Sequence, residues 1–509
     1  MVRWQDYRVT YRELWDRTTA LAKGMLALGL EKGDRLGLFS PNRYEWVLTQ
    51  YAAARVGAIL VNINPAYKTQ ELGYVLRQSG ASVLFLAPSF RQTDYVAMVE
   101  AVRGECPGLL RTVVFERDWD GLLAAGAAVT DDDLARREAS LQFDDPINIQ
   151  YTSGTTGFPK GATLSHHNVV NNGFFVGEGI RLTSEDRLCI PVPFYHCFGM
   201  VMGNLGCTTH GATMVIPGEG FDARLVLETV AAERCTALYG VPTMFIGELD
   251  DPRRKDLDLS SLRTGIMAGS PCPIEVMKEV VSAMHMREVT ICYGMTETSP
   301  VSVQSAVDDP LDKRVSTVGR VGPHVEVKIV DPITSQVVPR GTSGELCTRG
   351  YSVMLGYWEN EEATRAAIDV AGWMHTGDLA TMDDEGYVNI VGRIKDLVIR
   401  GGENIYPREV EEFLHTHPAI SEAQVIGVPS VRYGEEVMAW VRVKPGAAVT
   451  DADLVTFCTG RIATYKIPRY WKVTTEFPMT VTGKVQKFKM REIATIELGL
   501  DTAAKTKMA

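Results

Sequence analysis

The sequence Tyr-Thr-Ser-Gly-Thr-Thr-Gly-Phe-Pro-Lys-Gly occupies residues 151–161, at the end of a strand-like stretch, residues 147–151. Its glycines allow backbone N–H groups to approach phosphate oxygens, its hydroxyls can donate hydrogen bonds, and the Lys160 ammonium offsets negative charge. A strand that leads into such a loop predicts a phosphate-binding site. The loop differs from a Walker A motif because Lys160 follows a proline and precedes a glycine. A flexible polar turn between two strands is the alternative interpretation.

The sequence on both sides of this loop alternates between helix-like and strand-like stretches. Residues 10–13, Thr-Tyr-Arg-Glu, match a capping box at the start of a helix, and residues 35–39 and 81–86 are expected strands. The same alternation continues through residues 145–300. It predicts an α/β fold with largely parallel sheets covered by helices.

Two changes of pattern divide the rest of the chain. Residues 315–395 contain short strands and turns, which predict a β-rich subdomain of the large N-terminal domain. After Gly392 the pattern restarts with strands followed by a helix, and we expect a small, mobile α+β C-terminal domain. The predicted domains are residues 1–394 and residues 395–509, and the smaller one has a size typical of an independent domain.

Composition excludes several classes of protein. The 509 residues include 63 acidic and 52 basic side chains, a formal net charge of −11, which argues against a general nucleic-acid binder. No apolar run approaches the roughly 18 residues of a membrane span, and the first residues do not resemble a signal peptide. The nine cysteines are scattered without a CxxC pair, which favours a reducing compartment. We therefore expect a cytoplasmic protein.

Four further motifs place polar groups at turns or strand ends. They are residues 292–297 (Cys-Tyr-Gly-Met-Thr-Glu), residues 375–378 (His-Thr-Gly-Asp), residues 392–404, and residues 480–484 (Thr-Val-Thr-Gly-Lys). The hydroxyl and carboxylate of Thr296 and Glu297 could hold a phosphate oxygen and its Mg²⁺. A tight turn expected at residues 375–378 presents Asp378, whose two acceptor oxygens suit a sugar diol. Singly, each motif is also compatible with an exposed loop or an ordinary turn.

Together, the order and spacing of these motifs resemble the adenylate-forming superfamily of acyl-CoA synthetases, adenylation domains and beetle luciferases. The resemblance covers essentially the whole chain. Within it, four stretches resemble the medium-chain type of fatty acid:CoA ligase: residues 161–168, 238–245, 349–358 and 399–407. Family members usually carry a longer segment before residues 8–13, so the large domain is expected to be short at its N terminus.

The resemblance implies a reaction that uses ATP, Mg²⁺, coenzyme A and a fatty acid. A carboxylate attacks the α-phosphate of ATP to give acyl-AMP and pyrophosphate, and the CoA thiol then displaces AMP. The residues implied in catalysis are Lys484, Thr296, Glu297, Lys160 and His196. Among them, Thr296 contacts the α-phosphate, Glu297 binds Mg²⁺, and Lys484 reaches the α-phosphate and the substrate carboxylate. Such chemistry needs positive charge and oriented donors where negative charge accumulates.

The resemblance also implies how the nucleotide is held. Asp378 binds the ribose hydroxyls with help from Arg393. The phosphate loop comprises Thr152, Ser153, Gly154, Thr155, Thr156, Gly157, Phe158, Pro159 and Lys160, and adenine is flanked by Gly269, Ser270, Pro271 and Tyr293.

The acyl and CoA sites follow from the same resemblance. His196 lies near the substrate carboxylate, and the walls of the acyl site are Phe198, Met200, Gly240 and Val241. Lys395 is the hinge about which the small domain rotates between half-reactions, and Gly402 leaves room for the pantetheine chain of CoA. From the residues alone, a hydrogen-bonded core histidine and simple core packing of Phe198 and Met200 are the alternatives.

Two other functions on the same scaffold stay open at this point. A luciferase-type monooxygenase would oxidise its adenylate, and release of light or CO₂ would reveal it. A carrier-loading protein would pass its acyl group to a phosphopantetheine on a separate partner, since nothing after residue 400 resembles a carrier domain. No motif in the sequence indicates the preferred acid or the oligomeric state.

Overall fold

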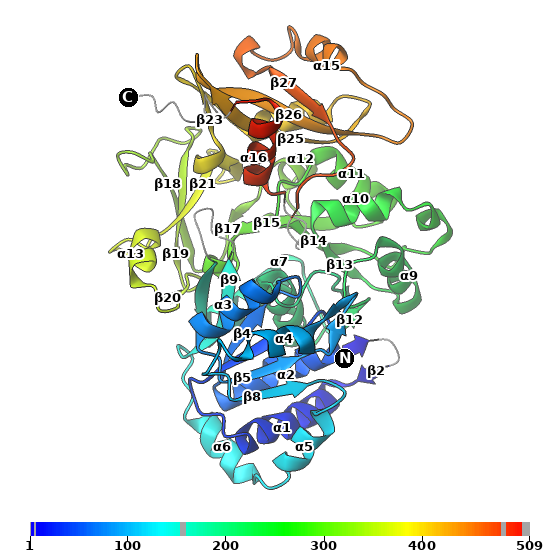
Figure 1. Ribbon diagram of the computed structural model, residues 1–509. Helices are drawn as coiled ribbons and strands as arrows, with labels where there is room; N and C mark the ends of the chain where they lie inside the picture. The colour runs from blue at the N-terminus through cyan, green and yellow to red at the C-terminus, as the bar shows by residue number, and fades with distance from the viewer. Residues whose placement is uncertain (1, 5–6, 153–158, 480–484, 501–509) are drawn as a thin grey trace. The chain divides into compact units, whose positions relative to one another are not determined.

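The computed structural model describes residues 2–4, 7–152, 159–479 and 485–500 (Figure 1). The chain divides into two compact units, residues 1–327 with 348–375, and residues 328–347 with 376–509. The boundary predicted between residues 394 and 395 falls inside the second unit, and it stays a prediction.

The first unit contains a seven-stranded sheet in which five neighbouring strands run parallel and two antiparallel strands extend one edge. In order, its strands are β20 (Gly356–Tyr357), β10 (Lys160–Ser165), β9 (Pro146–Thr152), β4 (Ile59–Ile63), β3 (Arg35–Phe39), β5 (Val83–Leu86) and β8 (Arg111–Val114). Strands β3, β4 and β5 are almost wholly buried and apolar, as expected for parallel strands covered on both faces. The strands predicted at residues 35–39 and 81–86 are confirmed.

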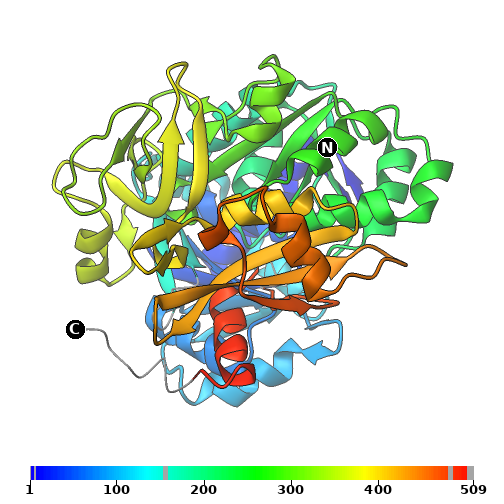
Figure 2. The same ribbon diagram turned by 90° about the horizontal axis from the view of Figure 1, so that it is seen from above.

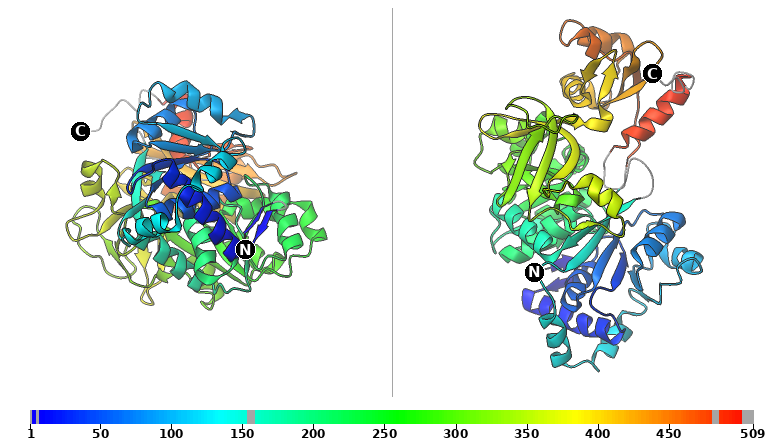
Figure 3. Two further views of the ribbon diagram at one scale, coloured as in Figure 1. Left: turned by 90° about the horizontal axis from the view of Figure 1, so that it is seen from below. Right: turned by 90° about the vertical axis from the view of Figure 1, so that its left-hand side faces the viewer.

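A second, nine-stranded sheet contains six neighbouring parallel strands with antiparallel strands at both edges. In order, its strands are β17 (Arg320–Val321), β16 (Val301–Gln304), β15 (Glu288–Gly294), β14 (Thr264–Ala268), β13 (Ala237–Gly240), β11 (Arg187–Cys189), β12 (Thr213–Ile216), β1 (Val2–Trp4) and β2 (Tyr7–Val9). The described chain begins near one edge of this sheet, where β1 pairs with β12 and β2 (Figure 3).

Helices connect the parallel strands and cover the sheets. Helix α1 (Tyr11–Ala27) begins with the predicted capping box, in which Thr10 and Glu13 hydrogen-bond each other's backbone N–H groups. It packs against α2 (Tyr44–Val56) and α5 (Trp119–Gly126), and Figure 1 shows α5 next to α1. The other helical segments of this unit are α3 (Thr69–Ser79), α4 (Tyr95–Arg103), α6 (Asp131–Ala139), α7 (His166–Gly179), the π-helix η1 (Phe198–Leu205), α8 (Gly206–His210), α9 (Ala223–Glu233), α10 (Pro242–Asp250), η2 (Pro252–Asp256), α11 (Ile274–Ala283), η3 (Thr296–Thr298), α12 (Leu311–Ser316) and α13 (Glu361–Ala367), and a short hairpin joins β6 (Ser89–Phe90) to β7 (Thr93–Asp94).

The β-rich region forms a four-stranded sheet, and the division between the two units passes through its strands. In order, these are β18 (Val325–Val330), β19 (Gly344–Gly350), β21 (Met374–Met382) and β22 (Val388–Arg393).

The tight turn predicted at residues 375–378 is wrong, because these residues belong to strand β21. Gly377 adopts a left-handed φ of 71° within the strand, and its N–H donates to Glu345 Oε1 at 3.0 Å. The left-handed conformation of Gly377 therefore belongs to an irregularity within the strand and not to a turn that reverses the chain. Asp378 still has a defined position, since it lies opposite Arg393 of β22.

The second unit also contains a five-stranded sheet whose two faces are both covered. Along β26, the side chains of Val437, Ala439 and Val441 face a core with α14 and α15, whereas Met438 and Trp440 face a core with α16. This alternation is the two-residue period of a strand. Figure 2 shows α16, in red, lying against the long strands. The elements are β24 (Glu403–Ile405), β23 (Val398–Arg400), β26 (Gly434–Val443), β25 (Ile420–Ser430), β27 (Tyr470–Val473), α14 (Pro407–His415), α15 (Asp451–Cys458), α16 (Lys487–Glu497), η4 (Ile394–Asp396) and η5 (Thr464–Lys466).

Candidate nucleotide and acyl site

The hairpin of β9 and β10 brings together the two ends of the predicted phosphate loop. Thr152 lies opposite Lys160 in antiparallel register, and the Thr152 hydroxyl oxygen lies 3.4 Å from the Lys160 carbonyl oxygen. Pro159 is held from outside the hairpin, because its carbonyl accepts a 3.1 Å hydrogen bond from the Tyr74 hydroxyl. The loop residues predicted to contact phosphate between these ends lie outside the described residues; they are Ser153, Gly154, Thr155, Thr156, Gly157 and Phe158.

Glu297 lies beside the base of this loop. It belongs to η3, which follows β15, and it is buried with 4% of its surface exposed, next to Thr296, which is also buried. The Tyr357 hydroxyl donates to Glu297 Oε1 at 2.8 Å, and the Thr152 hydroxyl lies 3.3 Å from the same oxygen. The Glu297 carbonyl also accepts the Met354 N–H at 2.9 Å. The carboxylate predicted to bind Mg²⁺ thus contacts the base of the loop predicted to bind phosphate.

Tyr357 contacts both charged residues of this group. The Lys160 Nζ lies 4.8 Å from the centroid of the Tyr357 ring, which is a cation–π contact. Burial, together with the adjacent Glu297 carboxylate, raises the pKa of Tyr357, so its hydroxyl stays protonated and donates. The sequence analysis missed this residue, although the family-like stretch 349–358 contains it, because no local chemistry distinguishes it from other tyrosines.

The predicted adenine site lies where parallel strands of the nine-stranded sheet end side by side. Ala268 is the last residue of β14 and pairs in register with Cys292 of β15. Tyr293 is the next residue of β15, and β14 is followed directly by Gly269, Ser270 and Pro271. Open α/β sheets bind ligands outside the carboxyl ends of their strands. The structure therefore brings these four residues to one edge of the sheet.

Gly240 and Val241 connect the neighbouring strand β13 to helix α10. A Cβ atom at position 240 would lie 2.9 Å from the ring of Phe245, so the glycine makes room for a buried aromatic side chain. Val241 is 5% exposed and precedes the first residue of the helix. Both residues thus lie at the same sheet edge, and their predicted contact with an acyl chain stays a prediction.

His196 lies between β11 and the π-helix η1, in the segment predicted to bind the substrate carboxylate. Its Nδ1 accepts a hydrogen bond from the Phe198 backbone N–H at 3.1 Å. Because Nδ1 accepts, the proton of the neutral imidazole resides on Nε2. Phe198 is 5% exposed, and its ring packs against that of Tyr239 with 5.4 Å between centroids.

Met200 participates in a network of buried polar side chains. The side-chain amides of Asn62 and Gln150 both donate to its Sδ, each at 3.1 Å. The Asn62 amide also donates to the Tyr195 carbonyl at 2.9 Å, and the Cys197 thiol donates to Gln150 Oε1 at 3.2 Å. These contacts tie the seven-stranded sheet to the segment that leads into η1. The sequence analysis missed both amides, and the predicted role of Met200 in the acyl-site wall stays a prediction.

The second unit holds the other predicted residues. Asp378 and Arg393 lie opposite each other on β21 and β22, with 3.1 Å between the Arg393 Nε and the Asp378 Oδ1. Lys395 lies in the short helix η4. Gly402 lies between β23 and β24 with a φ of 90°, a conformation that itself favours glycine. Lys484 is outside the described residues, and its role in adenylation stays a prediction.

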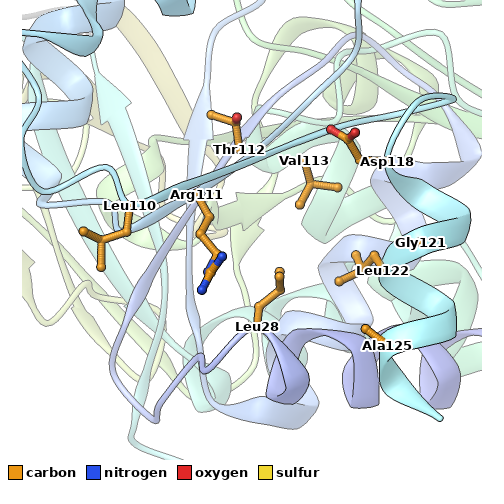
Figure 4. Close-up of a pocket in the computed structure, with 9 residues that line it drawn as sticks. All are labelled: Leu28, Leu110, Arg111, Thr112, Val113, Asp118, Gly121, Leu122 and Ala125. Carbon is orange, nitrogen blue, oxygen red and sulfur yellow. The ribbon is translucent and has the colours of Figure 1, made fainter. Parts of the chain in front are cut away.

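A cavity of about 380 Å³ lies elsewhere in the first unit, between α1, β8 and α5 (Figure 4). Its lining combines leucine side chains with Arg111 and Asp118. The Asp118 carboxylate accepts hydrogen bonds from the Val114 N–H at 2.8 Å and from the Arg117 guanidinium at 2.9 Å. The predicted site residues that the structure describes do not line this cavity, so it is not the predicted acyl site.

Comparison with known protein families matches residues 1–358 to the AMP-binding enzyme model and residues 409–484 to the AMP-binding enzyme C-terminal domain. The chain belongs to the AMP-binding enzyme family. The Bacillus subtilis (strain 168) protein YngI, named provisionally as an acyl-CoA synthetase, is 49% identical over 514 residues, which cover 97% of this chain and 93% of YngI. The mitochondrial medium-chain acyl-CoA ligase ACSF2 of Danio rerio is 46% identical, over 97% of this chain and 85% of ACSF2. The crystal structure of ATP-bound MatB from Rhodopseudomonas palustris superimposes with a TM-score of 0.85 at 32% identity, over 95% of this chain and 93% of that chain.

These matches confirm the predicted α/β fold and the resemblance to acyl-CoA synthetases of the adenylate-forming superfamily. The prediction of an enzyme, an AMP-forming acyl-CoA synthetase, is confirmed on the same grounds. The predicted domain boundary falls between the two family matches and stays a prediction. Within the described ranges, no helix combines the length and apolarity needed to cross a bilayer.

Proposed function

We propose that this acyl-CoA synthetase ligates medium-chain fatty acids to CoA. First, a carboxylate oxygen attacks the α-phosphorus of ATP, the bond from that phosphorus to the oxygen bridging to the β-phosphate breaks, and pyrophosphate leaves. Then the CoA sulfur attacks the acyl carbon, the bond from that carbon to the AMP oxygen breaks, and the thiol proton is released. The name of the relative ACSF2, a medium-chain acyl-CoA ligase, supports this substrate class.

The observation that carries the proposal is the convergence of Lys160 and Glu297 on Tyr357, at the base of the loop that begins at Thr152. Attack on phosphorus between anionic groups needs a positive charge and oriented donors at the position where negative charge increases. In this proposal Lys160 supplies the charge. Thr152 and Thr296 supply hydroxyls, and the backbone of residues 153–158 supplies further donors.

Glu297 has the chemistry of a Mg²⁺ ligand. Mg²⁺ prefers carboxylate oxygens and is commonly held by one or two carboxylates together with substrate phosphates. Both hydrogen bonds that the described residues donate to the Glu297 carboxylate reach Oε1, which leaves Oε2 for a cation. When bound there, Mg²⁺ would offset the charge of the phosphates.

His196 and the residues after it are proposed to hold the acyl group. With its proton on Nε2, the imidazole has a donor suited to a carboxylate. Phe198, Met200, Gly240 and Val241 are proposed as neighbours of the hydrocarbon chain, which gains free energy by leaving water for apolar surroundings.

The remaining residue roles are proposed on the family resemblance. Asp378 and Arg393, joined by their ion pair, would hold the ribose, and Gly269, Ser270, Pro271 and Tyr293 would flank adenine. Lys484 would act in adenylation, Lys395 as the hinge between residues 1–394 and 395–509, and Gly402 along the pantetheine chain. The proposed partners are small molecules, and the proposed compartment is the cytoplasm.

A pyrophosphate-release screen over straight-chain acids from C2 to C18 and benzoates, with and without CoA, tests the proposal. We expect the fastest turnover with medium-chain acids and the appearance of acyl-CoA only when CoA is present. Lys160→Ala should lower pyrophosphate release about 100-fold, comparable to the loss of one charge-stabilising donor. Preference for benzoates, or light or CO₂ as products, would contradict it.

A further inference from the structure

Tyr357 lies where three strands place side chains on one face. Thr152 of β9 is directly opposite Lys160 of β10, and Ala162 of β10 is directly opposite Tyr357 of β20. Residues two apart in a strand share a face, and diagonal neighbours on adjacent strands are within reach of long and aromatic side chains. The pairing register thus places Thr152, Lys160 and Tyr357 together on that face.

Glu297 contacts the same face from η3. Its Oε1 accepts the Tyr357 hydroxyl at 2.8 Å and lies 3.3 Å from the Thr152 hydroxyl. A carboxylate with one oxygen fixed by donors has lost rotational freedom, so its second oxygen has a defined direction. The phenol acts here as a neutral donor to a buried anion, which is among the stronger kinds of hydrogen bond.

The ring of the same tyrosine contacts the cation. The Lys160 Nζ lies 4.8 Å from the ring centroid. An aromatic face attracts an ammonium without neutralising it, so the lysine keeps its charge for an anionic ligand. One side chain therefore orients the Glu297 carboxylate through its hydroxyl and the Lys160 ammonium through its ring.

The backbone around Tyr357 is fixed on both sides. The Tyr357 N–H donates to the Thr364 hydroxyl at 2.9 Å, and the next residue, Trp358, donates its N–H to the Gly161 carbonyl at 2.7 Å. Three residues earlier, the Met354 N–H donates to the Glu297 carbonyl at 2.9 Å. The segment is thus attached to the lysine strand and to the carboxylate segment alike.

We infer that Tyr357 is a positioning residue for adenylation: its hydroxyl orients Glu297 toward a divalent cation, and its ring orients Lys160 toward the phosphates. The inference rests on the proposed function, in which Glu297 and Lys160 meet the metal and ATP. The two roles are separable, because phenylalanine removes the hydroxyl and keeps the ring, whereas leucine removes both.

Two binding measurements on the full chain separate these roles without turnover. Calorimetry with α,β-methylene-ATP in EDTA measures metal-free nucleotide binding, and paramagnetic resonance of Mn²⁺ in the presence of the same analogue measures metal binding. We expect Tyr357→Phe to leave metal-free binding within about twofold and to weaken Mn²⁺ binding about tenfold or more, as for loss of a hydrogen bond to a charged group. Tyr357→Leu should in addition weaken metal-free binding about threefold to tenfold, as for loss of a cation–π contact.

A matched control is Tyr351→Phe, which removes a tyrosine hydroxyl from the same segment where it lies 3.4 Å from the Asn172 amide. This variant should keep both affinities. In a Glu297→Gln background, Tyr357→Phe should have no further effect on Mn²⁺ binding, because the oriented charge is already gone.

Unchanged Mn²⁺ binding in Tyr357→Phe, or a full additional loss in the Glu297→Gln background, would overturn the hydroxyl role. Equal metal-free affinities of the Phe and Leu variants would overturn the ring role. Since Phe is isosteric, the hydroxyl test stands even where the Leu variant does not fold. Failure of the adenylation step on which the inference rests has a different signature: the unaltered protein then releases no pyrophosphate with any acid of the screen.

Discussion

The proposed nucleotide side of the first unit consists of Thr152, Lys160, Glu297 and Tyr357, and the proposed acyl side consists of His196, Phe198 and Met200 with the amides of Asn62 and Gln150. The two sides are built from different contacts. On the nucleotide side, charged groups meet a half-buried tyrosine. On the acyl side, the Asn62 and Gln150 amides and the Met200 thioether that accepts from them are neutral and buried. A charged group can exchange one partner for a ligand or water, whereas a buried neutral donor that loses its acceptor has no replacement. Changes on the nucleotide side should therefore affect catalysis alone, and changes on the acyl side should affect stability as well.

Glu297→Gln should give the largest effect of this kind. The amide oxygen can still accept from Tyr357 and Thr152, but the charge proposed to bind the cation is lost. We expect pyrophosphate release to fall about 100-fold or more, with the free energy of unfolding changed by less than about 1.5 kcal/mol, because the buried amide oxygen still accepts the same hydrogen bonds. Steady-state kinetics and urea unfolding of the same preparation measure both quantities. A loss of stability that accounts for the loss of activity would remove the distinction between the two sides.

Met200→Leu tests the acyl side. Leucine has a similar volume but no thioether, so the Asn62 and Gln150 amides lose a buried acceptor. We expect the free energy of unfolding to fall by about 2 kcal/mol and the KM for the fatty acid to rise, with the KM for ATP unchanged. Met202→Leu is the matched control, since Met202 is equally buried in η1 and its sulfur has no hydrogen bond among the described residues. Equal destabilisation by the two changes would show that the thioether network contributes nothing beyond packing.

Much of this fold could be predicted from local sequence. Runs such as residues 35–39 and 81–86 are apolar because parallel strands are covered on both faces, and the capping box at residues 10–13 is a contact between near neighbours. The phosphate loop could be recognised because its glycines and hydroxyls are consecutive.

The residues that organise the site could not be predicted in the same way. Tyr357 contacts Lys160 and Glu297 only because β20 pairs with β10, a pairing between distant segments that local patterns do not encode. Asn62 and Gln150 are polar residues within strands, a pattern that normally indicates exposure, yet both are buried by long-range contacts. The error at residues 375–378 has a related cause, because a glycine favours a left-handed φ in a turn and in an irregular strand alike.

Glu248 tests the comparison from the opposite direction, since it is an ionisable group buried on α10, the helix that follows Gly240 and Val241. It lies on α10, is 0% exposed, and neither carboxylate oxygen has a hydrogen-bond partner within the described part of the chain. Burial raises the pKa of Glu248 well above its ordinary value of 4.5, so the folded protein keeps the proton.

The sign of the pH dependence follows from that shift. Below pH 4.5 both folded and unfolded states hold the proton; above it only the unfolded state loses it, and stability falls with rising pH. Over the pH range above 4.5 in which only the unfolded state has lost this proton, the unfolding free energy of the unaltered protein should fall relative to Glu248→Gln by up to about 1.4 kcal/mol per pH unit. Urea unfolding of both proteins at several pH values measures this difference. A difference independent of pH would mean that Glu248 is ionised in the folded state.

The smallest expected effect concerns the substrate rather than the protein. If the acyl side is neutral and apolar, each methylene added to a saturated acid should improve binding by about 0.8 kcal/mol, or about fourfold in KM, until the site is filled. The KM for ATP should stay constant along the series, because the nucleotide side meets only the carboxylate end of the acid. Steady-state kinetics with acids from C4 to C12, at saturating ATP and CoA and again at saturating acid, measures both trends.

Phe198→Ala should extend the series toward longer acids without altering the dependence on ATP, since it removes a ring from the proposed wall and no charge. Equal KM values for butanoate and octanoate would show that the chain does not enter apolar surroundings, and a KM for ATP that varied with chain length would show that the two sides are not independent.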